Sequence, residues 1–355
     1  MEYGLICTIC KSRYDSVFGS QICKKCHGIL EVEYKASPKK VDIRASKSFW
    51  DFESVLPNGD YKHYIVGGTR LVRGESNDNV YMKIEPENPT RSFKDRGSVI
   101  EIAKALEYGY SEIVCASTGN MAYSLAYYSK IAGIKAKIFM GEGANQNKVA
   151  KIKSVGSASV HIINGDFTKA EDLAKSYAEK HDAFLTGDYC YREEGQKTIS
   201  YEVMGQLPDV THIIIPVGNA TLISGMFKGL VEMVASGTIT RMPRLIAVQA
   251  SGSDSVVEAF RSGSNAIKYM KPKTKADAIA VGLPKFGLQT LDAINKTGGS
   301  AISVTDAEME RMQHKFYEEF GMVAELGGVA SLAALEKMRL SKKDRAVAII
   351  SGANV

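Results

Sequence analysis

The chain has 355 residues, of which 45% are hydrophobic and 24% charged, so it can bury a large core and is expected to form two domains with a small appendage. A formal net charge of +5 is too small to indicate a nucleic-acid partner. No apolar run approaches the ~20 residues that a membrane span requires, and the first residues lack the charged and apolar regions of a signal peptide. We therefore expect a cytoplasmic protein.

Four of the six cysteines form two C-x-x-C pairs, Cys7 with Cys10 and Cys23 with Cys26. Each pair can present two thiolates from one tight turn, and two such turns complete a tetrahedral sulfur shell for zinc. The alternatives are disulfides, which a reducing cytoplasm disfavours, and a redox site, which would need a βαβ pattern around a pair. His27 could substitute as a ligand, although four cysteines suffice. We expect a zinc ribbon in residues 1–35 whose Zn²⁺ is structural, because no coordination position stays open.

The next part of the chain leads to a polar decapeptide. Residues 31–60 lack clear periodicity and predict a linker, whereas Val80–Ile84 alternates like a strand. The decapeptide, residues 88–97, reads Asn-Pro-Thr-Arg-Ser-Phe-Lys-Asp-Arg-Gly and is followed by apolar residues at helical spacing. Lys94 is therefore expected in the first turn of a helix, where the partial positive charge disfavours an ammonium and lowers the lysine pKa. That suits a Schiff-base former, and a solvated lysine between its charged neighbours is the alternative.

The decapeptide resembles the cofactor-lysine motif of threonine synthases and their relatives among the fold-type II pyridoxal phosphate enzymes. The resemblance implies that Lys94 carries pyridoxal 5'-phosphate and is the catalytic residue. It also implies an α/β fold of two parallel-sheet, three-layer domains with the cofactor between them, and a homodimer. We assign residues 36–97 and 186–355 to the large cofactor-binding domain and residues 98–185 to the small α/β domain.

After the lysine helix, short apolar strands alternate with amphipathic helices, which indicates a parallel α/β sheet. The expected strands are Ile113–Ala116, Lys135–Met140 and Ser159–Ile163, and the expected helices are Met121–Ala132, Asn147–Val155 and Thr168–Lys180. The first strand leads through small polar residues into a helix, a place where ligands of open α/β sheets collect. By the resemblance, Asn120 there bonds the cofactor ring hydroxyl, and the substrate carboxylate is held by Ser117, Thr118 and Gly119.

Residues 191–198 resemble the Tyr-Arg-x-Glu-Gly-Gln-Lys-Thr tract of threonine synthases. The resemblance gives Arg192 the role of binding the substrate phosphate, and the planar fork of an arginine suits that task. A surface charge cluster with Glu193 is the alternative.

Three further strands are expected at Ile213–Ile215, Leu245–Val248 and Ala346–Ile350. The first is followed by a small-residue turn and a helix start, whose N–H groups and dipole can hold a phosphate. We expect the cofactor phosphate to be held by Gly218, Asn219, Ala220, Thr221 and Leu222, although the family pattern Gly-Asn-x-Gly-Asn is kept here only in its first two residues. The last strand ends at Ser351, which the resemblance places at the pyridine nitrogen.

The chain departs from the family where the substrate phosphate is bound: Met121 stands for a threonine, and Thr186 and Gly187 stand for an asparagine-serine pair. Each lost hydrogen bond to a charged phosphate would cost ~1.5–3 kcal/mol.

We therefore expect a divergent lyase of amino acid biosynthesis with a small, phosphorylated amino acid substrate. The leading hypothesis is conversion of O-phosphohomoserine and water to threonine and phosphate. The alternatives are β-replacement on O-phosphoserine, as in cysteate synthase, a serine or threonine dehydratase, and an inactive zinc-ribbon binding protein.

Overall fold

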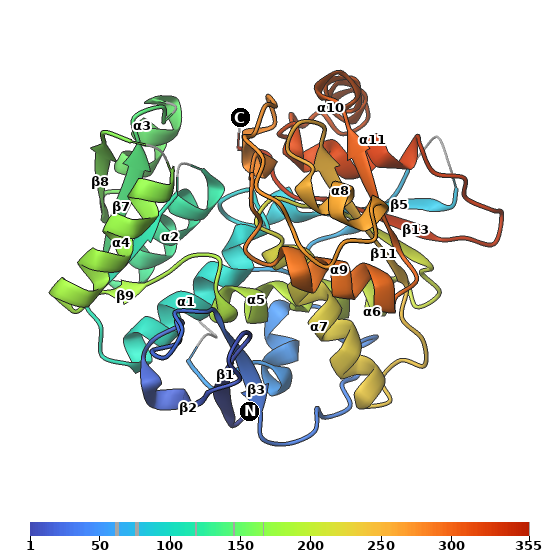
Figure 1. The fold of residues 1–355 in the computed structure, drawn as a ribbon. Helices are drawn as coiled ribbons and strands as arrows, with labels where there is room; N and C mark the ends of the chain where they lie inside the picture. Colours follow the sequence, from blue (N-terminus) through green and yellow to red (C-terminus); the bar gives the residue numbers. More distant parts are fainter. Residues whose placement is uncertain (61–63, 75–77, 118, 145, 166, 355) are drawn as a thin grey trace. The chain divides into compact units, whose positions relative to one another are not determined.

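The computed structural model describes residues 1–60, 64–74, 78–117, 119–144, 146–165 and 167–354, which form two compact units (Figure 1). Unit 1 consists of Met1–Ser37, Glu53–Val66 and Lys94–Gly195, and unit 2 consists of Pro38–Phe52, Gly67–Phe93 and Gln196–Val355. The N-terminal ribbon and the lysine helix thus group with the smaller sheet. The predicted division into a ribbon, a large domain and a small domain concerns parts that fold separately, and it stays a prediction.

The ribbon of unit 1 is a three-stranded antiparallel sheet of β1 (Tyr3–Cys7), β2 (Arg13–Asp15) and β3 (Leu30–Tyr34), in the order β2-β1-β3. The expectation of a linker from residue 31 was wrong for β3. Its alternation of apolar and charged residues buries Leu30 and Val32 and leaves Glu31 and Glu33 partly exposed. Phe49–Val55, in the same expected linker, forms a 3₁₀-helix.

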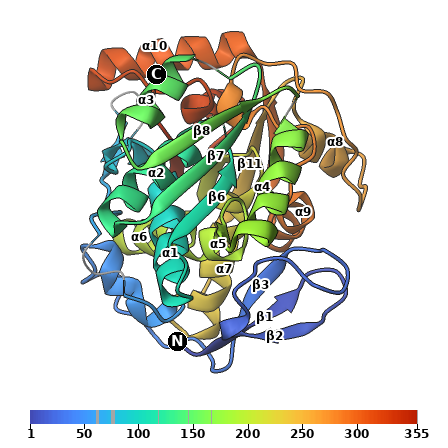
Figure 2. The same cartoon turned by 90° about the vertical axis from the view of Figure 1, so that its left-hand side faces the viewer.

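Unit 1 also contains a four-stranded parallel sheet in the order β8-β7-β6-β9. Its strands are β6 (Glu112–Ala116), β7 (Lys135–Gly141), β8 (Ala158–Ile163) and β9 (Phe184–Leu185), and its helices are α1 (Lys94–Glu107), α2 (Asn120–Ala132), α3 (Gln146–Ser154), α4 (Phe167–His181) and α5 (Cys190–Gln196). Val114 and Ala116 of β6 pack against Ala170 and Ala174 of α4, which covers one face of the sheet (Figure 2). The predicted strands and helices of this unit are present, and their ends differ by at most one residue.

Unit 2 is built on a six-stranded sheet in the order β12-β11-β10-β13-β5-β4, in which β4 alone of these six runs antiparallel to its neighbour. The strands are β4 (Leu71–Arg73), β5 (Val80–Ile84), β10 (His212–Pro216), β11 (Arg244–Ala250), β12 (Ser300–Val304) and β13 (Ala346–Ile350). The helices are α6 (Thr198–Gln206), α7 (Thr221–Ala235), α8 (Ser255–Arg261), α9 (Gly287–Lys296), α10 (Asp306–Phe320) and α11 (Ala330–Leu335). Strands β10 and β13 are buried throughout, as expected for central strands of a parallel sheet covered on both faces.

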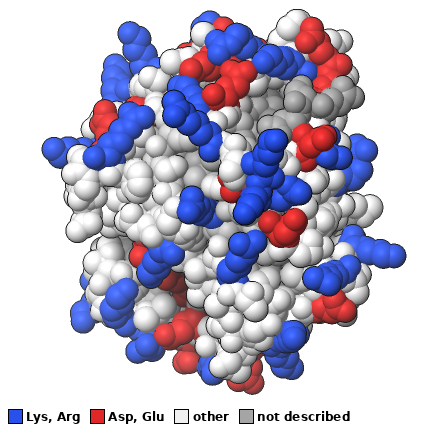
Figure 3. Space-filling view, turned by 90° about the vertical axis from the view of Figure 1, so that its right-hand side faces the viewer, with Lys and Arg blue, Asp and Glu red and all other residues white. Residues whose placement is uncertain are grey.

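Figure 3 shows mixed charge on one face of the molecule. On the face shown in Figure 3, Lys and Arg side chains lie among Asp and Glu side chains and do not form one continuous basic patch. Among the described residues, no helix combines the length and the apolar character that crossing a membrane requires.

Two glycines allow helices α1 and α5 of unit 1 to cross closely. A Cβ added at Gly195 would lie 1.9 Å from the carbonyl oxygen of Arg96, and one added at Gly97 would lie 2.5 Å from Cγ of Arg192. Both glycines belong to the polar motifs found in the sequence. Their missing side chains bring the backbone that carries Lys94 against the helix that carries Arg192.

We predict that Gly195→Ala destabilises the chain by roughly 3 kcal/mol, because a methyl group at a backbone-to-backbone contact forces the two helices apart. Urea unfolding of the cofactor-free chain measures this loss. Gly143→Ala is the matched control, since a Cβ at that position meets nothing within 4 Å. Equal unfolding midpoints for the two variants would show that the crossing tolerates the extra atom.

Candidate active site

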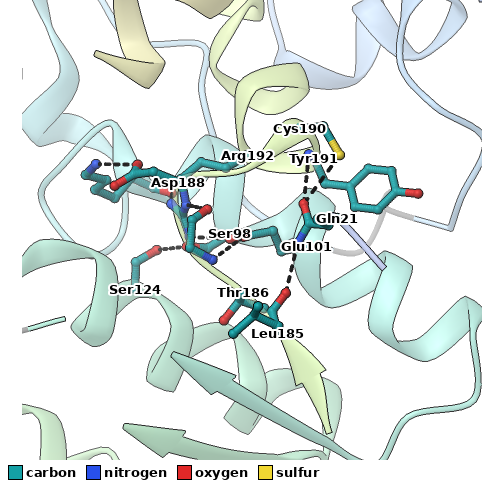
Figure 4. Close-up of polar contacts among 12 residues, drawn as sticks. Gln21, Ser98, Glu101, Ser124, Leu185, Thr186, Asp188, Cys190, Tyr191 and Arg192 are labelled. Carbon is teal, nitrogen blue, oxygen red and sulfur yellow. Dashed lines mark hydrogen bonds and ion pairs between the residues drawn. The ribbon is translucent and has the colours of Figure 1, made fainter. Parts of the chain in front are cut away.

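Lys94 is the first residue of α1, and its side chain is 19% exposed. Its Nζ lies 3.5 Å from Oδ1 of Asp188, whose side chain is 7% exposed (Figure 4). Burial lowers the pKa of Lys94 below that of an ordinary lysine; the Asp188 carboxylate opposes this change and the Arg192 guanidinium adds to it. The amine therefore loses its proton more readily than a solvated lysine would. The direction agrees with the sequence prediction, but burial is the main cause, whereas the sequence pointed to the helix terminus.

Arg192 of α5 points toward Ser98 and Glu101 in a polar network of unit 1 (Figure 4), which also includes the backbone carbonyl of Lys94. Its Nε donates to the Gly187 carbonyl at 2.9 Å, and its Nη1 donates to the Lys94 carbonyl at 3.1 Å. Its Nη2 donates to Ser98 Oγ at 3.3 Å and pairs with the Glu101 carboxylate. Each guanidinium nitrogen thus has a protein acceptor. The predicted contact with the substrate phosphate stays a prediction, and a phosphate would have to compete with Glu101.

Glu101 is a residue of the site that the sequence interpretation missed. It is fully buried, pairs with Arg192 and accepts the Gly187 N–H at 2.7 Å. Burial raises the pKa of Glu101 to about 7, against the lowering effect of Arg192 and of the Gly187 N–H. A signal was available in the sequence: Lys94, Ser98 and Glu101 stand at the i, i+4, i+7 spacing of one helix face.

A short turn connects the end of β6 at Ala116 to the start of α2 at Asn120. The Gly119 N–H donates to Ser117 Oγ at 3.3 Å, and a Cβ added at Gly119 would meet nothing within 4 Å, so the turn borders open space. Asn120 is the first residue of α2. The predicted residue Thr118 lies outside the described residues.

Helices α1 and α2 are joined one turn after they begin. Ser124 Oγ donates to Ser98 Oγ at 2.8 Å, and both serines are buried. Ser124 stands four residues after Asn120, and Ser98 stands four residues after Lys94. The hydroxyl contact therefore fixes the starts of these two helices relative to each other within unit 1.

In unit 2, the expected strand-turn-helix cradle is present between the end of β10 at Pro216 and the start of α7 at Thr221. Ala220 has a φ of 71°, a left-handed conformation that few non-glycine residues adopt. A Cβ added at Gly218 would lie 3.1 Å from the carbonyl oxygen of Ala278. The first N–H groups of a helix have no intrahelical acceptor, so this turn has the backbone donors that an anion needs.

Ser351 follows the last strand of unit 2. Its N–H donates to the Gly328 carbonyl at 3.2 Å, and its own carbonyl accepts the Phe93 N–H at 3.1 Å. Phe93 directly precedes Lys94 in the chain. The end of β13 and the lysine motif are thus joined by a backbone hydrogen bond, while the role of the Ser351 hydroxyl stays a prediction.

The four predicted zinc ligands cluster in the ribbon. The Sγ atoms of Cys7, Cys10, Cys23 and Cys26 all lie within 4.8 Å of one another. Cys7 and Cys26 are 3.4 Å apart, and Cys10 and Cys23 are 3.5 Å apart. Four thiol donors at this spacing fit the tetrahedral shell of a structural Zn²⁺.

Comparison with known proteins decides the family. Residues 64–352 match the family described as pyridoxal-phosphate dependent enzyme. The threonine synthase of Methanosarcina acetivorans is 36% identical over 354 residues, which cover 95% of this chain and 87% of that protein. The threonine synthase of Methanocaldococcus jannaschii is 34% identical, with 98% of this chain and 91% of that protein covered. The chain belongs to the threonine synthase family.

A solved structure shares the fold of this chain. Maize serine racemase has a TM-score of 0.70 and 25% identity, with 81% of this chain and 88% of that chain covered. The predicted family and fold class, a fold-type II α/β enzyme of the pyridoxal phosphate group, are therefore confirmed.

We predict that Asp188→Asn lowers the pKa of Lys94 further, because the variant loses the carboxylate that stabilises the ammonium. Competitive acetylation of the cofactor-free chain across a pH series, read by mass spectrometry of the Lys94 peptide, measures that pKa. Asp172→Asn, which changes an exposed aspartate of α4, is the matched control. An unchanged titration midpoint in Asp188→Asn would mean that the carboxylate does not act on Lys94.

Proposed function

We propose that the chain is a pyridoxal 5'-phosphate-dependent carbon–oxygen lyase that works as a threonine synthase, converting O-phosphohomoserine and water to threonine and phosphate. The observation that carries the proposal is the largely buried Lys94 at the start of α1, whose Nζ lies 3.5 Å from the Asp188 carboxylate and whose pKa is lowered. The near full-length similarity to proteins named threonine synthase supports the choice of reaction.

The residues present fit the cofactor. Lys94 would hold it through its amine, and the turn at 218–222, with its Ala220 backbone in the left-handed region, would receive its phosphate. Asn120 would bond the ring hydroxyl, and Ser351 would face the ring nitrogen. When bound, pyridoxal phosphate withdraws electrons from the bonds at the α-carbon of an attached amino acid.

The side chains of this protein then position the substrate and move protons. Ser117 and Gly119 would hold the substrate carboxylate, together with Thr118. Lys94 would take the α-proton of the substrate and later return it, a role that an amine with a lowered pKa can fill near neutral pH. For Arg192 we propose that it holds the Lys94 backbone, since its nitrogens already contact protein oxygens.

A second candidate reaction follows from the charge balance of unit 1. Around the lysine, Nζ of Lys94 lies beside Asp188 and the Arg192 guanidinium contacts Glu101, so each basic side chain has a carboxyl partner. Paired charges attract a phosphate less strongly than an excess of cations would. A hydroxyl leaving group needs no such excess. Dehydration of serine or threonine is therefore the alternative that this observation favours.

Product analysis of the purified enzyme tests the proposal. With O-phosphohomoserine we expect threonine and phosphate in equal amounts, and Lys94→Ala should lose this activity by a factor of about 10³ or more. O-Phosphoserine with sulfite serves as the comparison substrate for β-replacement. A 2-oxo acid from serine, with no threonine from O-phosphohomoserine, would reject the proposal in favour of the dehydratase.

We further propose that the ribbon holds one structural Zn²⁺ and that the enzyme is a cytoplasmic homodimer. Metal analysis should find one zinc per chain, and Cys10→Ser should lose it, because four thiolates form the site. Chelation should lower the melting temperature of the full chain. Cys115→Ala changes a cysteine outside the cluster and should keep the metal. Zinc retained in Cys10→Ser, or a disulfide between two of the four cysteines, would contradict the assignment.

A further inference from the structure

A ribbon side chain reaches the segment that contains Asp188. Gln21 is 2% exposed, and its Nε2 donates to the Leu185 carbonyl at 2.8 Å. Its Oε1 accepts the Tyr191 N–H at 3.1 Å and lies 3.6 Å from Cys190 Sγ (Figure 4). One amide therefore bonds both ends of the segment from Leu185 to Tyr191.

The residues between these two ends face the lysine helix and the sheet. Both the N–H and the hydroxyl of Thr186 donate to the Val114 carbonyl, at 2.9 and 3.1 Å. The Gly187 N–H donates to Glu101, and Asp188 lies beside Lys94. The segment is thus held by α1 and β6 in its middle and by Gln21 at its ends.

Gln21 is itself fixed by the ribbon. Its carbonyl accepts the Leu30 N–H at 3.1 Å, which ties it to β3. The ribbon makes a second contact with the same segment, since the hydroxyls of Tyr3 and Tyr191 lie 3.2 Å apart in buried surroundings. A rigid support of this kind limits how far a loop carboxylate can move from its partner.

We propose that Gln21 is a positioning residue for the lysine site: by bonding Leu185 and Tyr191, it holds Asp188 against Lys94. The inference rests on the proposed role of Lys94 in the reaction. By this proposal the ribbon helps to position Asp188 beside Lys94. This role is separate from any stability that a bound metal gives to the chain.

The test compares full-length chains that differ at Gln21. Gln21→Ala removes the amide together with buried packing. Gln21→Met removes the hydrogen bonds but keeps a side chain of similar length, so it serves as the test if Gln21→Ala does not fold. Lys25→Ala is the matched control, because it truncates an exposed side chain of the same ribbon. The pH midpoint of Lys94 acetylation in the cofactor-free chain is the main readout, and thermal unfolding is recorded beside it. In the cofactor-loaded enzyme, kcat is measured for the same set.

We expect both Gln21 variants to shift the Lys94 midpoint to lower pH, in the same direction as Asp188→Asn, with Lys25→Ala unchanged. In the loaded enzyme, kcat should fall about tenfold, as expected when the loss of a supporting contact lets a catalytic group move.

A lower melting temperature with the wild-type Lys94 midpoint would overturn the proposal, since a purely structural contact would give that result. If Asp188→Asn leaves the midpoint unchanged, the proposal also fails. The labelling needs no turnover, so a shifted midpoint in a chain that is inactive toward O-phosphohomoserine would support this inference while rejecting the proposed reaction.

Discussion

The buried ion pair between Arg192 of α5 and Glu101 of α1 is the interaction on which the lysine site depends. Both side chains are completely buried, and removing one partner of such a pair typically costs ~3–5 kcal/mol because the other charge is left without compensation. The further contacts of the pair with Gly187 and with the Lys94 carbonyl satisfy the groups that would otherwise face a low dielectric. The observed arrangement of α1, α5 and the loop before α5 supplies all of these hydrogen bonds and the charge pair. Lys94 is thereby held largely out of water beside the Asp188 carboxylate.

This arrangement explains how one lysine among many acquires unusual chemistry. The loss of water around Nζ favours the neutral amine and lowers the pKa of Lys94. The Asp188 carboxylate stabilises the ammonium and so limits how far this pKa falls. The close approach of α1 and α5 through Gly97 and Gly195 supplies the burial. Packing, backbone geometry and charge pairing therefore act together on the same amine, which is the usual condition for a reactive lysine in an enzyme.

Much of the fold and part of the site could be predicted from the sequence. Strands β6 to β8 and helices α2 to α4 of unit 1 end within one residue of their predicted ends because their apolar periodicity is strong. The cysteine cluster and the position of Lys94 could be predicted because each depends on residues near one another in the chain. Strand β3 was missed, since five residues with two glutamates look like a polar linker until the ribbon buries Leu30 and Val32. Asp188 and Gln21 were missed because their partners are distant in sequence, and pairing of that kind leaves no local pattern. Glu101 was missed although it stands on the helix face of Lys94 and Ser98, because that spacing does not point to its distant partner Arg192.

The central claim is that Lys94, at the start of α1, is the residue that carries the cofactor. The most direct measurement is borohydride reduction of the enzyme loaded with pyridoxal phosphate, followed by protease digestion and mass spectrometry of the modified peptide. The account predicts one phosphopyridoxyl group per chain, attached to Lys94. Attachment to another lysine, such as the buried Lys83 of unit 2, or the absence of a modified peptide, would contradict it.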